Sequence, residues 1–182
     1  MTQPIRLAIN GASGRMGRAL LALVREDKRF ELVNALVSAH SAHNGTPVFA
    51  DLSTSLRYAH DWNAVTANVV IDFSGPDGLS AALDYCIAHE AALVTGTTGI
   101  DASLQTRLDQ AAQRIPLLHA ANFSLGVAVL KRLLRQAAAA LPDWDLEIVE
   151  AHHGRKEDAP SGTALALGDA AAEARGTSLA KE

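Results

Sequence analysis

The chain opens with a short apolar stretch, residues 5–10, that runs directly into a glycine-rich turn and then into a helical pattern. The turn places Gly11, Gly14 and Gly17 three residues apart. A strand, a glycine turn and a helix in this order predict a phosphate site, because backbone amides at the helix start can approach a pyrophosphate. Plain turns also use glycine, but the position at the first strand-to-helix junction favours a dinucleotide.

Strand and helix patterns alternate through residues 1–124. Further strands are expected at 31–37, 69–74, 92–95 and 116–120, with helices between them, including one near 53–59. This alternation predicts an α/β domain of the Rossmann-like type, a doubly wound parallel sheet with helices on both faces. Small or polar residues follow these strands at their carboxyl ends, where ligands of such sheets bind.

Residues 125–182 are expected to begin a second domain, of α+β type, for substrate binding and oligomerisation. A long helix is predicted over residues 124–141, a strand over 146–150 and another helix from 161 onward. One strand with one or two helices makes a thin core. We therefore expect this second domain to be incomplete at residue 182.

The segment from Glu150 to Ala164 joins that predicted strand to the last helix and concentrates groups suited to chemistry. His152 can exchange a proton near neutral pH, and Lys156 supplies a positive charge. The backbone amides of Gly162 and Thr163 lie at the predicted helix start, which favours an anion such as a substrate carboxylate. These features indicate an active site.

Two other interpretations of this segment stay open. Adjacent histidines, His152 and His153, can be metal ligands, but neighbours in an extended segment point to opposite sides and no third ligand stands at a metal-binding spacing. A solvated polar loop with an ordinary helix cap is the second alternative. We predict no metal site.

The end of the second predicted strand bears on the choice of cofactor. An acidic residue there usually binds the adenosine ribose of NAD, and an Arg pairs with the 2′-phosphate of NADP. The chain has Val37 and Ser38 at this place, followed by Ala39 and His40. Since neither charge is present, we expect weak discrimination between NADH and NADPH.

Composition narrows the class of protein further. The 182 residues carry a formal net charge of −4 without basic clusters, which argues against a nucleic-acid surface. Cys86 is the single cysteine, so a disulfide framework is excluded and a reducing cytoplasm is expected. The sequence predicts neither a signal peptide nor a transmembrane helix, and hence no membrane partner.

Taken together, these residues resemble the 4-hydroxy-tetrahydrodipicolinate reductase (dihydrodipicolinate reductase) family of bacterial lysine and diaminopimelate biosynthesis. The resemblance covers essentially the whole chain and rests on four motifs in order: the glycine turn, Gly-Thr-Thr-Gly at 96–99, Ala-x-Asn-Phe-Ser at 120–124, and the segment 150–164. It implies reduction of a cyclic imine dicarboxylate, dihydrodipicolinate or its hydroxy-tetrahydro form, to tetrahydrodipicolinate with NADH or NADPH.

The resemblance also implies roles for particular residues. His152 would be the proton donor and acceptor and Lys156 a second proton donor, while His153, Gly162 and Thr163 would bind substrate. Cofactor contacts would come from Gly11, Ala12, Ser13, Gly14, Arg15, Met16, Val37, Ser38, Phe73, Gly96, Thr97, Thr98, Ala120, Ala121, Asn122 and Phe123. A homotetramer is implied as well.

Two other classes of function are considered beside this one. The chain could be a nucleotide-binding module without turnover, or another NAD(P)-dependent dehydrogenase that acts on an amino or keto acid. Oxidation of the cofactor with and without freshly made dihydrodipicolinate separates the three.

Overall fold

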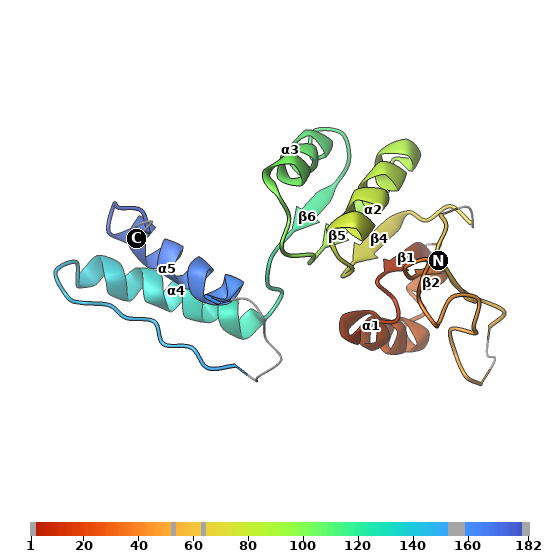
Figure 1. Cartoon of the computed structure of the whole chain (residues 1–182), viewed down its shortest axis with the longest axis horizontal. Helices are drawn as coiled ribbons and strands as arrows, with labels where there is room; N and C mark the ends of the chain where they lie inside the picture. Colours follow the sequence, from red (N-terminus) through yellow and green to blue (C-terminus); the bar gives the residue numbers. More distant parts are fainter. Residues whose placement is uncertain (1–2, 52–53, 63–64, 153–158, 180–182) are drawn as a thin grey trace. The chain divides into compact units, whose positions relative to one another are not determined.

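A computed structural model describes residues 3–51, 54–62, 65–152 and 159–179 of the chain (Figure 1). The chain divides into two compact units, residues 1–120 and residues 121–182. In the described residues no helix is long and apolar enough to cross a membrane.

The first unit is a six-stranded sheet in which every neighbouring pair of strands is parallel. The strand order is β3-β2-β1-β4-β5-β6, so the order reverses between β1 and β4. This is the doubly wound topology that the sequence predicts. The strands are β1 (Ile5–Asn10), β2 (Phe30–Leu36), β3 (Tyr58–Ala59), β4 (Val69–Asp72), β5 (Ala92–Thr95) and β6 (Leu117–His119).

Three helices cover the two faces of this sheet, α1 (Arg15–Glu26), α2 (Pro76–His89) and α3 (Ala102–Ala111). Helix α1 lies on one face, whereas α2 and α3 lie together on the other (Figure 1). The central strand β1 serves both faces, because its side chains alternate: Leu7 and Ile9 are buried on the α1 side and Ala8 on the α2 side.

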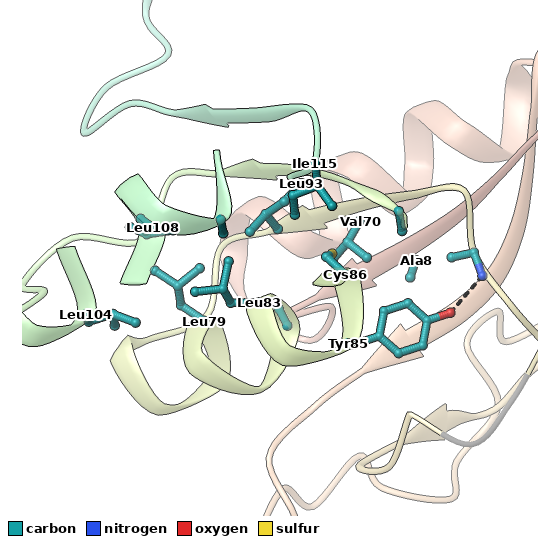
Figure 2. Close-up of a cluster of buried hydrophobic side chains, with 14 of the residues drawn as sticks. Ala8, Val70, Leu79, Leu83, Tyr85, Cys86, Leu93, Leu104, Leu108 and Ile115 are labelled. Carbon is teal, nitrogen blue, oxygen red and sulfur yellow. Dashed lines mark hydrogen bonds between the residues drawn. The ribbon is translucent and has the colours of Figure 1, made fainter. Parts of the chain in front are cut away.

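The larger of the two hydrophobic clusters packs α2 and α3 against β4 and β5 (Figure 2). Leu83 and Cys86 of α2 are fully buried there. Burial, with a smaller contribution from the charge of Asp72, raises the pKa of the Cys86 thiol to about 12. The hydroxyl of Tyr85 accepts a hydrogen bond from the backbone N–H of Ala67 at 2.8 Å, which ties α2 to the entry of β4.

The helix predicted near residues 53–59 is wrong for the part that the structure describes. Residues 54–56 form no helix, and Tyr58 and Ala59 form the edge strand β3 beside β2. Tyr58 is buried in the cluster under α1. Pairing with the open edge of the sheet therefore prevails over the weak helical preference of a Ser- and Thr-containing segment.

The second unit is built on two helices that pack against each other, α4 (Leu125–Ala140) and α5 (Gly162–Ala174). Ser124 and Ser161 cap them: each side-chain oxygen accepts a hydrogen bond from the backbone N–H three residues on. Small buried residues, including Ala138 and Ala171, allow a close approach. The apolar stripe of α4 is exposed within the described residues, with Leu133 at 56%.

The strand predicted over residues 146–150 is also wrong. The structure gives these residues no regular secondary structure. A β-strand needs a neighbouring strand to accept and donate its backbone hydrogen bonds, and the described residues of this unit contain no other strand.

Candidate active site

The glycine turn between β1 and α1 has a geometry that only glycine fits at two positions. Gly11 has a φ of +77°, and a Cβ there would lie 2.4 Å from the carbonyl oxygen of Phe73. A Cβ on Gly17 would lie 2.3 Å from the carbonyl oxygen of Gly11, so α1 packs directly on the turn. Gly14 is the N-cap of α1 and has no side chain to cap the first-turn amides. This arrangement suits a phosphate.

A buried carboxylate fixes the loops around this turn. Asp72, at the end of β4, is fully buried, and its two oxygens accept four hydrogen bonds from three different strand ends. The donors are the amide of Asn10 (2.8 Å) and the hydroxyls of Ser74 (2.5 Å), Thr95 (2.7 Å) and Thr97 (2.6 Å). Four donors use all the lone pairs of a carboxylate, so the network is saturated.

The Asp72 network extends to the start of α2. The Asn10 amide also donates to the carbonyl oxygen of Gly78 at 3.0 Å. The network thus sets the positions of the β1, β4 and β5 loops relative to one another. Sequence reasoning missed Asp72 as a site residue, although an acidic residue at the end of the apolar run Val69–Ile71 was a usable signal.

A cavity of about 590 Å³ opens beside the glycine turn, where the strand order reverses. Its lining includes six of the predicted cofactor residues: Gly11, Ser13, Gly14, Val37, Ser38 and Phe73. It also includes residues that the sequence did not single out, among them Asn10, His60, Trp62, Ser74 and Asp77. The crevice at such a reversal is where doubly wound sheets bind nucleotides.

The other predicted cofactor residues of the first unit lie outside this lining. Ala12 is fully buried under the turn, whereas Arg15 and Met16 are exposed on the first turn of α1. A Cβ at Gly96 would lie 2.1 Å from the ring of Phe73, so the close contact of these two residues requires glycine. The Thr97 hydroxyl is turned inward to Asp72. Thr98 is exposed and Ala120 is half-buried at the end of β6.

In the second unit, Glu150 organises the start of α5. One of its carboxylate oxygens accepts from the backbone N–H of Ser161 at 2.7 Å, and the other accepts from the Ser161 hydroxyl. The latter oxygen also lies 3.7 Å from Nδ1 of His152, whose side chain is 41% exposed. An acidic group at a helix start is favoured by the helix dipole. Glu150 therefore holds both the cap and the candidate acid.

At the start of α5, the predicted substrate residue Thr163 contacts Asn122 of the predicted cofactor motif. Thr163 Oγ1 accepts a hydrogen bond from the side-chain nitrogen of Asn122 at 3.1 Å, and the side-chain oxygen Oδ1 of Asn122 accepts one from the backbone N–H of Ser124. Gly162 begins α5, and space for a Cβ there is open. Ala121 and Phe123 flank Asn122 and are exposed. His153 and Lys156 lie outside the described residues.

The described residues contain no group of three or more His, Cys, Asp and Glu side chains that could hold a metal ion. The glycine cradle at the first helix and the cavity at the reversal of strand order define a dinucleotide-binding α/β protein. The glycine positions fit such a cofactor, because a Cβ at Gly11 or Gly17 would clash with the backbone of the neighbouring loop or of the turn itself, and the turn could not keep this shape.

Comparison with known proteins identifies the family. Residues 5–123 match the family model "Dihydrodipicolinate reductase, N-terminus", and residues 126–182 match "Dihydrodipicolinate reductase, C-terminus". The chain belongs to the dihydrodipicolinate reductase family.

Individual relatives agree with this assignment. The chain is 48% identical over 173 residues to a 4-hydroxy-tetrahydrodipicolinate reductase of Xanthomonas campestris pv. campestris (strain B100), covering 93% of this chain and 70% of the relative. It is 49% identical over 172 residues to one of Stenotrophomonas maltophilia (strain K279a), covering 92% and 69%. A dipicolinate-bound dihydrodipicolinate reductase from Paenisporosarcina sp. TG-14 superimposes with a TM-score of 0.71 at 28% identity, covering 94% and 67%.

Proposed function

We propose that the chain reduces dihydrodipicolinate, or 4-hydroxy-tetrahydrodipicolinate with loss of its hydroxyl as water, to tetrahydrodipicolinate in lysine and diaminopimelate biosynthesis. It does so as an NAD(P)H-dependent oxidoreductase acting on a small dicarboxylate. The observation that carries this proposal is that the family match runs through both the glycine turn and the segment that holds His152 and Ser161.

The proposed chemistry assigns one task to the cofactor and the others to the chain. The nicotinamide, when bound, supplies a hydride to a carbon of the conjugated carbon–nitrogen system and is oxidised. The displaced electron pair of the substrate needs one proton, and we assign its donation to His152. A well-positioned general acid contributes roughly 100- to 10,000-fold to the rate. Lys156 is proposed as a second donor for the same proton.

We assign substrate binding to the start of α5. His153, Gly162 and Thr163 are proposed to bind the substrate, with the amides of Gly162 and Thr163 directed at a carboxylate. The Asn122–Thr163 hydrogen bond supports this assignment, because it fixes the side chain of Thr163 at the first turn of the helix.

The proposed cofactor contacts are the sixteen residues named from the sequence. The boundary between the two domains is proposed to lie between residues 124 and 125. Six of them line the cavity beside the glycine turn, which supports the assignment for the first unit. A homotetramer and a cytoplasmic location are proposed from the family resemblance. Light scattering of the purified chain tests the first, and fractionation of the source cells tests the second.

The test is cofactor oxidation by the purified chain, followed by absorbance with and without freshly made dihydrodipicolinate. Oxidation that depends on this substrate supports the proposal. Binding of NADH or NADPH without turnover indicates a nucleotide-binding module instead. Turnover with amino or keto acids, and none with dihydrodipicolinate, indicates a different dehydrogenase.

A further inference from the structure

The residue that follows the edge strand β3 lines the cavity together with the residues that follow β2. Ala35 pairs with Tyr58 and Leu36 with Ala59 in parallel register, and the Val37 N–H donates to the Ala59 carbonyl at 2.9 Å. Continuing this register by one residue places His60 beside Val37 and Ser38. Dinucleotide-binding sheets bind the adenosine ribose at the end of their second strand.

His60 and Trp62 line the same cavity as Ser38 and Gly14. Trp62 is held in place, because its ring stacks on Tyr85 at a centroid distance of 4.6 Å and the Tyr85 hydroxyl is hydrogen-bonded to the backbone at Ala67. The segment after β3 therefore contributes to the lining of the cavity, and its Trp62 is held by the core of the first unit.

The contact of His60 with Asn44 bears on which of the two ring nitrogens donates. The side-chain amide nitrogen of Asn44 lies 3.1 Å from His60 Nδ1. An amide nitrogen is a donor, so in the tautomer that makes this contact a hydrogen bond Nδ1 accepts and the ring hydrogen is on Nε2. His60 thus brings an N–H donor to a cavity whose neighbouring positions, Val37 and Ser38, carry no charge.

We propose that His60 is a specificity-determining residue that donates from Nε2 to the 2′ substituent of the adenosine ribose. This inference rests on the proposed function, since it places NADPH or NADH in the cavity. A hydrogen bond to a phosphate is charge-assisted and stronger than one to a hydroxyl, so His60 favours NADPH. Asp77 also lines the cavity. It belongs to α2, which follows β4, and β4 pairs with β1 on the side opposite to β2.

The experiment measures dissociation constants for NADPH and NADH by calorimetry on the full chain and three variants. His60→Ala removes the donor, and His60→Gln replaces it with an amide. His43→Ala is the matched control, because His43 packs against Tyr58 with ring centroids 5.6 Å apart and lies outside the cavity lining.

We expect His60→Ala to weaken NADPH binding by roughly tenfold and NADH binding by less than about twofold, the loss of one charge-assisted hydrogen bond. His60→Gln should recover most of the NADPH affinity, and His43→Ala should change neither. Equal losses for both cofactors, no loss, or a Gln variant as weak as the Ala variant would overturn the assignment of His60. If the unaltered chain binds neither cofactor, the proposed function fails together with it.

Discussion

The two units of the chain hold their candidate site residues in different ways. In the first unit the loops around the cavity are anchored by Asp72, which is fully buried and accepts four hydrogen bonds from them. In the second unit Glu150 and His152 have side chains that are 25% and 41% exposed. The first site is therefore anchored in the core, whereas the second lies on a partly exposed segment without regular secondary structure. Substitutions should cost stability in one and chemistry in the other.

The largest effect is expected in the second unit. His152→Gln should lower kcat, because the proton for the reduced substrate loses its donor. The corresponding loss of transition-state stabilisation should be about 3 to 5 kcal/mol. The dissociation constant of NADH and the free energy of unfolding should stay unchanged, since the side chain is partly exposed. Steady-state kinetics, calorimetry with NADH and urea unfolding measure the three quantities. Unchanged kcat would remove His152 from the mechanism, and His43→Gln controls for loss of an exposed imidazole.

The next largest effect is expected on stability, and it should differ between the cores of the two units. Leu83→Ala removes a fully buried side chain from the cluster between α2 and the sheet, and should destabilise the chain by about 2–5 kcal/mol. Leu133→Ala makes the same change on α4, where the side chain is 56% exposed, and should cost less than about 1 kcal/mol. Urea unfolding of both variants tests this. Equal losses would show that α4 is covered in solution.

The Asp72 network should link stability to cofactor binding. Asp72→Asn replaces an acceptor by a donor among the hydroxyls of Ser74, Thr95 and Thr97, and should cost about 1–3 kcal/mol of stability. Affinity for NADH should fall with it, because the loops of β1, β4 and β5 lose their common anchor. Asp84→Asn is the control, since Asp84 forms an exposed ion pair with Arg107. An unchanged NADH affinity at lowered stability would show that the network is only structural.

The smallest effect concerns the cofactor. The unaltered chain should bind NADH and NADPH with affinities within roughly tenfold, about 1.4 kcal/mol, since neither a repelling carboxylate nor a pairing Arg follows β2. Ser38→Glu should shift the balance towards NADH by repelling the 2′-phosphate. Ser38 suits this test because it is exposed, whereas Val37 is 7% exposed and a buried carboxylate would be destabilising. A preference of a hundredfold in calorimetry would contradict the prediction.

Much of the fold could be predicted because its signals are local. The glycine turn and the caps of α4 and α5, Ser124 and Ser161, each depend on a few neighbouring residues. The edge strand β3 could not be predicted, since two residues carry no periodicity and its formation depends on the open edge of β2. The prediction of a strand at 146–150 was wrong for the opposite reason. The local pattern of apolar and polar residues suits a strand, but the described part of the unit contains no partner strand.

The candidate sites divide in the same way. The glycine turn and the segment around His152 and Ser161 are recognisable as continuous motifs. Asp72 and His60 act through residues distant in the sequence: Asp72 binds side chains from 62 residues earlier and 25 residues later, and His60 is positioned by the pairing of β3 with β2. Only the assembled sheet brings these groups together.

Cys86 gives the first unit a built-in reporter of its own opening. It is the single cysteine of the chain, it is fully buried, and its pKa near 12 leaves almost no reactive thiolate at neutral pH. A thiol reagent can therefore modify it only when α2 separates from the sheet. The labelling rate then measures how often the nucleotide unit opens, and bound NADH should slow it in proportion to the stabilisation that binding provides.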